Sequence, residues 1–181
     1  MKPLNRRQST LLFVSAAVLV LAAVTAVGIL LEDQAAATDF SRRNLSPGLY
    51  ALFGTDWMGR DMLARTLAGL SLSIRIGLLT AAVSAVAALV VGACAALLGG
   101  WVDAVLSWCI DLVMGIPHIL LVMLISIACG RGFVGVVAGV SLSHWPSLAR
   151  VIRGEVLQLR RAPYVLAAEK LGVSRWGILR R

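Results

Sequence analysis

Charged and aromatic side chains are scarce in this chain, and their scarcity sets its class before any motif is considered. Only 14% of its 181 residues are charged and 6% are aromatic, whereas 59% are hydrophobic. The charges are nearly absent from long apolar runs and dense between them. This segregation is typical of a polytopic membrane protein and excludes an ordinary soluble globular core.

Motifs for nucleotide binding and hydrolysis are also missing. The chain has two lysines, Lys2 and Lys170, and neither follows a glycine-rich phosphate loop of the type GxxxxGK[ST]. Neither GxSxG nor HExxH occurs, so the chain has none of the serine-hydrolase or zinc-protease equipment that these motifs indicate. We therefore predict that the chain is not an enzyme and has no cofactor, which leaves transport or membrane assembly.

Cysteine and basic charge exclude two further classes. Cys94, Cys109 and Cys129 lie inside apolar runs, their number is odd and no CxxC occurs, so neither a disulfide framework nor a cysteine metal site is indicated. The net charge of +8 does not indicate nucleic-acid binding, because the basic residues flank apolar runs without interleaved aromatics. They fit the cytoplasmic flanks of a membrane protein.

Four apolar runs predict an all-α fold with about four transmembrane helices. Residues 11–31 carry no charge and can cross a hydrocarbon core of ~30 Å. This run exceeds the hydrophobic region of a signal peptide, so a retained helix is favoured over cleavage. Residues 76–145 hold the other three spans: 76–98, about 104–128, and the shorter 133–145.

The distribution of basic residues predicts the orientation. With residues 1–10 and 146–181 on the cytoplasmic side, eleven Lys and Arg lie inside and six outside. Basic residues favour the cytoplasmic flanks of membrane spans. We therefore expect a multi-pass protein with its N-terminus inside, and residues 32–75 form an extracytoplasmic loop.

The extracytoplasmic loop contains a second helical pattern. Asp56 can cap a following helix, and Leu63, Leu67 and Leu70 lie at helical spacing. An amphipathic interfacial helix is the favoured interpretation. The alternative is an ion-paired lid made by Asp56 with Arg60 and Asp61.

The third apolar run contains polar residues that are costly in a bilayer. Asp111, Met114 and His118 fall at i, i+3 and i+7, on one helical face, and Pro117 precedes the histidine. A metal site is one hypothesis. A satisfied polar contact between helices, combined with a proline kink, is favoured, because one histidine and one aspartate make a poor metal site.

Residues 147–181, here called the basic elbow, hold eight of the seventeen Lys and Arg. Pro163 suits the first position of a helix, and Gly172 suits the residue after a helix end. Ser174 can cap a further helix that carries Trp176. A short, basic, interrupted helical segment next to a membrane bundle predicts a docking surface.

Three motifs in this order resemble one family. Residues 54–65, GTDWMGRDMLAR, are similar to a GTDxxGRDxxSR signature, and its matching residues are Gly54, Thr55, Asp56, Gly59, Arg60 and Asp61. Residues 99–103, GGWVD, with Asp111 and Pro117 downstream, resemble a GGWxD…D…P hairpin. Residues 164–168, YVLAA, followed by Gly172, resemble an EAAxxxG coupling motif in which Leu166 replaces the glutamate. These motifs resemble the second permease subunit of bacterial ABC importers for dipeptides, oligopeptides and nickel.

The resemblance implies a type I importer permease fold in the bacterial inner membrane. Six spans are usual there, so the chain is expected to be C-terminally truncated. The coupling helices would contact an ABC ATPase through four residues: Tyr164, Ala167, Ala168 and Gly172. The other implied partners are a second permease, an extracytoplasmic solute-binding protein and membrane lipid. Nickel or another metal complex is slightly favoured as substrate over di- or oligopeptides.

Two other classes of protein remain as alternatives. One is a structural membrane protein whose basic tail binds anionic lipid. The other is a membrane-embedded enzyme that uses Asp111 and His118, for which few further polar residues are available.

Overall fold

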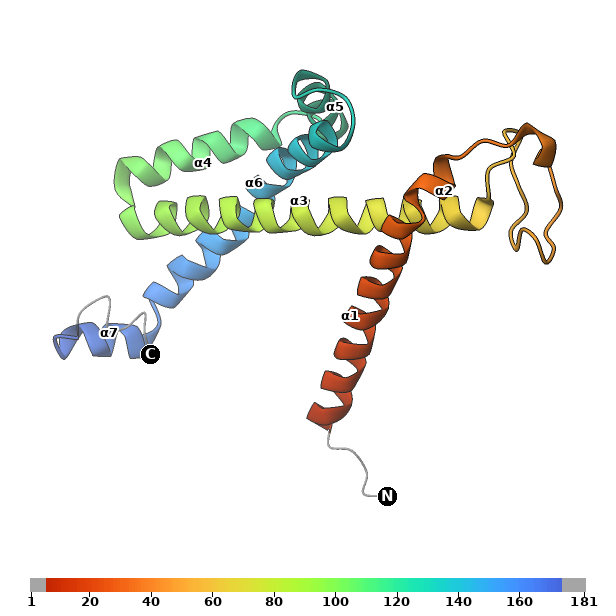
Figure 1. Ribbon diagram of the computed structural model, residues 1–181. Helices are drawn as coiled ribbons and strands as arrows, with labels where there is room; N and C mark the ends of the chain where they lie inside the picture. Colours follow the sequence, from red (N-terminus) through yellow and green to blue (C-terminus); the bar gives the residue numbers. More distant parts are fainter. Residues whose placement is uncertain (1–5, 174–181) are drawn as a thin grey trace. The chain divides into compact units, whose positions relative to one another are not determined.

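The computed structural model describes residues 6–173, apart from the side chains of residues 166 and 169, and this part of the chain is helical (Figure 1). It contains no strand within that range, only two isolated bridges in the loop before α3. The all-α fold class is therefore confirmed. The helices are α1 (Arg6–Leu30), α2 (Glu32–Ala36), the 3-10 turn η1 (Phe40–Arg42), α3 (Met62–Leu98), α4 (Gly100–Met114), α5 (His118–Ala128), α6 (Phe133–Arg160) and α7 (Pro163–Lys170).

The chain divides into two compact units, residues up to 78 and residues from 79. In the first unit, α1 meets the start of α3 at a glycine. A Cβ atom on Gly28 would lie 2.3 Å from the carbonyl oxygen of Leu67 and 2.4 Å from Cβ of Ser71. The Ser71 hydroxyl donates to the carbonyl of Thr25 at 3.1 Å. Small residues allow such close backbone approach between membrane helices.

Helix α3 begins earlier than the sequence indicated. It runs unbroken for 37 residues from Met62, so the expected interfacial helix and the expected span at 76–98 form one element. Asp61, rather than Asp56, caps it: the Asp61 carboxylate accepts the backbone N–H of Leu63 at 2.8 Å. At 1.5 Å per residue α3 is about 55 Å long, well above the ~30 Å of a hydrocarbon core.

The expected third span is bent in the structure. Helices α4 and α5 meet at an angle of 94° across a short break. Pro117 lies at this break, directly before α5, and a proline restricts the residue before it and has no N–H to donate. The predicted proline-associated distortion is therefore present, and it is a sharp turn rather than a kink.

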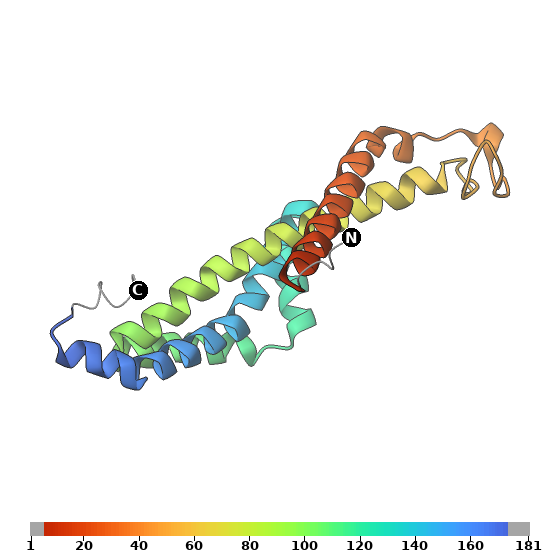
Figure 2. The same ribbon diagram turned by 90° about the horizontal axis from the view of Figure 1, so that it is seen from below.

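Helix α6 packs against both α4 and α5 in the second unit (Figures 1 and 2). Its glycines allow this: a Cβ on Gly139 would lie 2.7 Å from the carbonyl oxygen of Val122 in α5. Where α3, α4 and α6 meet, a small core forms from Ala88, Ile110 and Ala149. The fold of this unit thus depends on close backbone contact more than on large side chains.

Two helices of the described residues are long and apolar enough to cross a membrane, α1 and α3, and a third span arises if α4 and α5 are taken together. The expected count of four spans is therefore not confirmed. The fourth was expected at 133–145, which ends directly before Pro146. Instead Pro146 lies inside α6, which continues through a charged second half to Arg160.

Candidate functional site

A cleft between α4 and α6 collects charge inside the second unit. Arg153 of α6 makes two hydrogen bonds to the Asp103 carboxylate of α4, at 2.5 Å and 2.7 Å. Two turns further along α4, Asp111 pairs with Arg150. Asp111, Arg150 and Arg153, with Ser107 and Ile110, line a cavity of about 340 Å³.

The two ion pairs fix the rotational setting of α6 against α4. Asp103 and Asp111 are eight residues apart on α4, so the two aspartates share one face of that helix. Arg150 and Arg153 are three residues apart, so the two arginines share one face of α6. Sequence analysis placed both arginines in the basic elbow as docking charges and missed their partners. The signal was available: two aspartates on one face of the hairpin and two arginines on one face of the next helix.

A second cleft lies at the bend between α4 and α5. It has a volume of about 230 Å³, and Met114, His118, His144, Ser143 and Ser147 are among the residues that line it. The rings of His118 and His144 are 4.8 Å apart between centroids, with an interplanar angle of 63°.

The bend separates residues that the sequence placed together. Asp111 lines the first cleft with Arg150, whereas Met114 and His118 line the second. The predicted single face of Asp111, Met114 and His118 does not form, because the helix is interrupted before Pro117. Among the described residues no group of three or more His, Cys, Asp or Glu side chains could hold a metal ion.

Within the basic elbow, helix α7 begins and ends where the sequence predicted. Pro163 is the first residue of α7, and Gly172 follows the helix with φ of +78°. The backbone N–H of Val173 donates to the carbonyl of Ala168 at 3.1 Å, which is the longer bond of a Schellman C-cap. Both local predictions are confirmed, whereas the expected cap at Ser174 and the helix after it lie outside the described residues.

Helix α7 leaves an apolar stripe uncovered. Tyr164 is 64% exposed and Leu171 is 83% exposed, and the exposed Ala167 lies between them at helical spacing. Arg160, at the end of α6, donates to the carbonyl of Ala96 near the end of α3 at 2.5 Å. The stripe therefore follows a helix, α6, that is tied to α3 by Arg160 and to α4 by Arg150 and Arg153.

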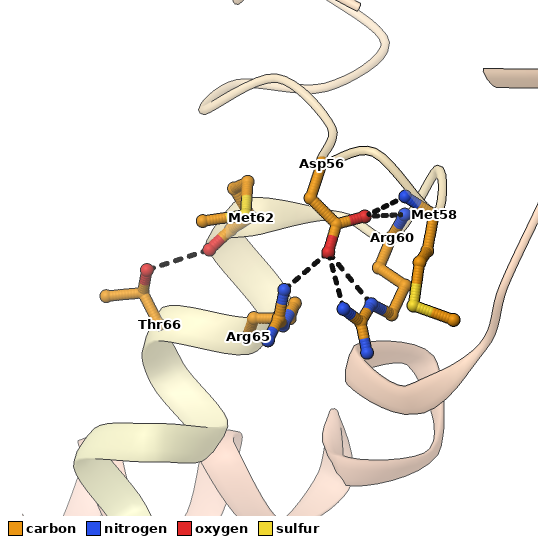
Figure 3. A network of polar contacts seen from close by, with 6 residues as sticks. All are labelled: Asp56, Met58, Arg60, Met62, Arg65 and Thr66. Carbon is orange, nitrogen blue, oxygen red and sulfur yellow. Dashed lines mark hydrogen bonds and ion pairs between the residues drawn. The ribbon is translucent and has the colours of Figure 1, made fainter. Parts of the chain in front are cut away.

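The signature residues of the loop before α3 hold that loop together (Figure 3). The Asp56 carboxylate accepts the backbone N–H groups of Met58 at 2.9 Å and Arg60 at 3.0 Å, and it pairs with the guanidinium groups of Arg60 and Arg65. Burial alone would raise the pKa of Asp56, but the hydrogen bonds from Arg60 and Met58 and the charge of Arg60 lower it to about 2. The carboxylate is thus ionised at any physiological pH.

Glycines of the same signature lie where only glycine fits. Gly59 has φ of +75°, and a Cβ there would lie 1.7 Å from the carbonyl oxygen of Asp39. Gly54 has φ of +72°, and a Cβ there would lie 2.5 Å from the carbonyl oxygen of Leu45. The Thr55 hydroxyl accepts the backbone N–H of Leu45 at 2.9 Å and donates to the carbonyl of Arg42. The signature residues therefore shape a compact loop, which combines features of both expected alternatives: an ion-paired loop leading into a capped helix.

Comparison with known proteins relates this architecture to transport. Residues 88–181 match the family described as binding-protein-dependent transport system inner membrane component. The chain is 29% identical to the dipeptide transport system permease protein DppC of Bacillus subtilis (strain 168) over 141 residues, which are 78% of this chain and 44% of the relative. It is 36% identical to a putative peptide transport system permease protein of Brucella suis biovar 1 (strain 1330) over 178 residues, 98% of this chain and 60% of the relative.

A third relative is covered to a similar extent. The oligopeptide transport system permease protein OppC of Bacillus subtilis (strain 168) is 30% identical over 141 residues, 75% of this chain and 46% of the relative. The chain thus spans about half the length of the curated relatives it matches.

Proposed function

This chain belongs to the family of binding-protein-dependent transport system inner membrane components, and on that premise we propose that it acts as a membrane-embedded permease subunit of an ATP-driven importer. The apolar helices α1 and α3 support insertion into the inner membrane. ATP hydrolysis is assigned to a separate subunit, consistent with the absence of a phosphate-binding loop from the sequence. We place the N-terminus in the cytoplasm, on the distribution of basic residues.

The observation that carries this proposal is the exposed stripe on α7. Its side chains, Tyr164, Ala167 and Leu171, are apolar and uncovered, and Lys170 and the arginines at the end of α6 flank them. A short helix laid into a groove of a partner presents such i, i+3, i+7 anchors. We assign this stripe, with Ala168 and Gly172, to docking on an ABC ATPase subunit.

The way α6 is held explains how docking can be transmitted. Two ion pairs fix α6 to α4, and Arg160 ties its end to α3. A displacement of α7 would therefore move these helices together, because α6 cannot rotate without breaking the pairs. We propose that ATPase closure moves the helices of the second unit in this way, against a second permease subunit.

For substrate, we propose peptides, because the three relatives described above are named for dipeptide, oligopeptide or peptide transport. A solute-binding protein would deliver the peptide to the extracytoplasmic side. Nickel, which the sequence resemblance slightly favoured, is kept as the second candidate substrate. Uptake of a labelled dipeptide, with unlabelled peptide or Ni²⁺ as competitor, separates the two.

Docking on an ATPase is tested through Gly172. A β-branched residue in its left-handed conformation is strained by about 1–2 kcal/mol, whereas asparagine adopts that conformation more readily. In native membranes, we expect Gly172→Val to reduce co-purification of the ATPase subunit and Gly172→Asn to retain it. Failure of the unaltered chain to recover any ATPase subunit would refute the proposal.

The lipid-binding alternative makes the opposite prediction for a rearranged tail. A variant in which residues 161–181 are shuffled at constant composition keeps the charge but loses the stripe. If the tail binds anionic lipid, the shuffled variant still binds vesicles, and its co-purification with other proteins is the same as that of the unaltered chain. If it serves an ATPase, co-purification is lost although vesicle binding persists.

A further inference from the structure

The chain has only two histidines, and the structure brings them together. They are 26 residues apart in sequence: His118 is the first residue of α5 and His144 lies within α6. Their ring centroids are 4.8 Å apart, and both line the cleft at the α4–α5 bend. Neither residue has a role in the coupling surface proposed above.

The separation of the rings suits one shared metal ion. Imidazole nitrogen atoms bind first-row metals at about 2.0–2.1 Å, which puts two rings around a tetrahedral ion at centroid distances of about 5 Å. The bend also brings the last residue of α4, Met114, to the same cleft. A methionine thioether can serve as a third donor to such an ion. Ser143 and Ser147 also line the cleft, and their hydroxyl groups donate to backbone carbonyls of α6.

The charge of the donors selects the ion. Among the described residues, no Asp, Glu or Cys lines this cleft, and the nearest acidic residue on α4, Asp111, lines the other cleft with Arg150. Two imidazoles and a thioether are neutral, so a divalent ion would leave two positive charges uncompensated beside Val113, Ile116 and Leu121. Thioether ligands select Cu(I) over harder ions, and imidazole also binds copper.

We propose that the cleft at the α4–α5 bend binds a soft monovalent cation of the Cu(I) class through His118, His144 and Met114. The site joins α5 to α6 across the bend. It does not depend on the importer function or on the substrate. The competing explanation is an edge-to-face contact of two neutral rings with no ligand.

The test is anaerobic Cu(I) titration of the purified chain against bicinchoninate, which is a coloured Cu(I) chelator. The chain carries no histidine tag, and all three cysteines are replaced by alanine to remove other soft ligands: Cys94, Cys109 and Cys129. We expect one equivalent of Cu(I) per chain. His118→Ala and His144→Ala should each weaken binding by at least about tenfold, and Met114→Leu should weaken it by less.

Two matched variants test the assignment of ligands. Met123→Leu removes a thioether of α5 that does not line the cleft, and Asp111→Asn removes the carboxylate of the other cleft; both should bind Cu(I) unchanged. X-ray absorption of the loaded unaltered protein should show nitrogen and sulfur ligands, a result that does not depend on how the variants fold.

Three results would overturn the proposal. The first is that the chain retains no Cu(I) in competition with the chelator. The second is that the histidine variants bind Cu(I) as tightly as the unaltered chain. The third is that the histidines bind Ni²⁺ or Zn²⁺ more tightly than Cu(I). Because no outcome involves uptake or an ATPase, failure here leaves the proposed function standing, and failure of that function leaves this site standing.

Discussion

Substitution of Gly92 by alanine probes the close contact on which the second unit depends. A Cβ at this position of α3 would lie 2.6 Å from the carbonyl oxygen of Ala149 and 3.1 Å from Cβ of Ile152, both in α6. The closest atom belongs to the backbone, so the clash is relieved only if α3 and α6 move apart. That movement would open the small core of Ala88, Ile110 and Ala149.

The magnitude follows from two opposing effects. Replacing glycine by alanine inside a helix stabilises it by about 1 kcal/mol where space allows, whereas overpacking costs about 1–3 kcal/mol. Gly154→Ala is the matched control, because Gly154 lies inside α6 in the same unit and has no atom within 4 Å of the Cβ position. Gly92→Ala should therefore be about 1–3 kcal/mol less stable than Gly154→Ala.

Reversible unfolding by SDS in mixed micelles, followed by far-UV circular dichroism, measures the difference between the two variants. The control cancels the general effect of alanine on helix stability and isolates the clash. If Gly92→Ala and Gly154→Ala were equally stable, α3 and α6 would not approach as described, and the rigid movement of α6 with α3 would lose its basis.

Two further predictions concern the charged groups. In a double-mutant cycle, Asp103→Asn and Arg153→Gln should couple by about 1–3 kcal/mol, because the pair is bidentate and largely shielded from solvent. The more exposed pair of Asp111 and Arg150 should couple by less than about 1 kcal/mol, and equal coupling would contradict this ranking. In the loop before α3, the pKa of Asp56 is lowered to about 2 from an ordinary 3.8. Its contribution to loop stability is therefore complete above about pH 4 and is lost as the pH falls through 2; protection of the loop from pepsin should fall over that interval, and Asp56→Asn should remove this dependence.

Local chemistry made part of the fold predictable. The start of α7 at Pro163 and its end before Gly172 depend only on a missing N–H and a positive φ, which the residue types reveal by themselves. The membrane-crossing character of α1 and α3 depends on composition over about 20 residues. These features need no knowledge of what packs against them.

Features that depend on tertiary contact could not be predicted in the same way. Asp111 and His118 share a face only if α4 and α5 are one straight helix, and the 94° bend assigns them to different clefts. Asp56 and Asp61 both suit a helix cap by sequence, and the turn at Gly59 decides that Asp61 caps α3. The meeting of His118 with His144 requires α6 to lie against α5, which no spacing within either helix indicates.

Docking of the exposed stripe of α7 on an ATPase subunit is the basis of the proposed function. Ala167→Cys, in a background without the native cysteines, places a single thiol at the centre of this stripe. In native membranes treated with a short thiol-reactive photocrosslinker, we expect an adduct with the ATPase subunit whose yield changes when ATP is added. Leu12→Cys, at an exposed position of α1, is the control. Docking of the stripe would be refuted if Ala167→Cys formed an adduct only with lipid. It would also be refuted if Ala167→Cys, like Leu12→Cys, formed no adduct with any ATPase subunit.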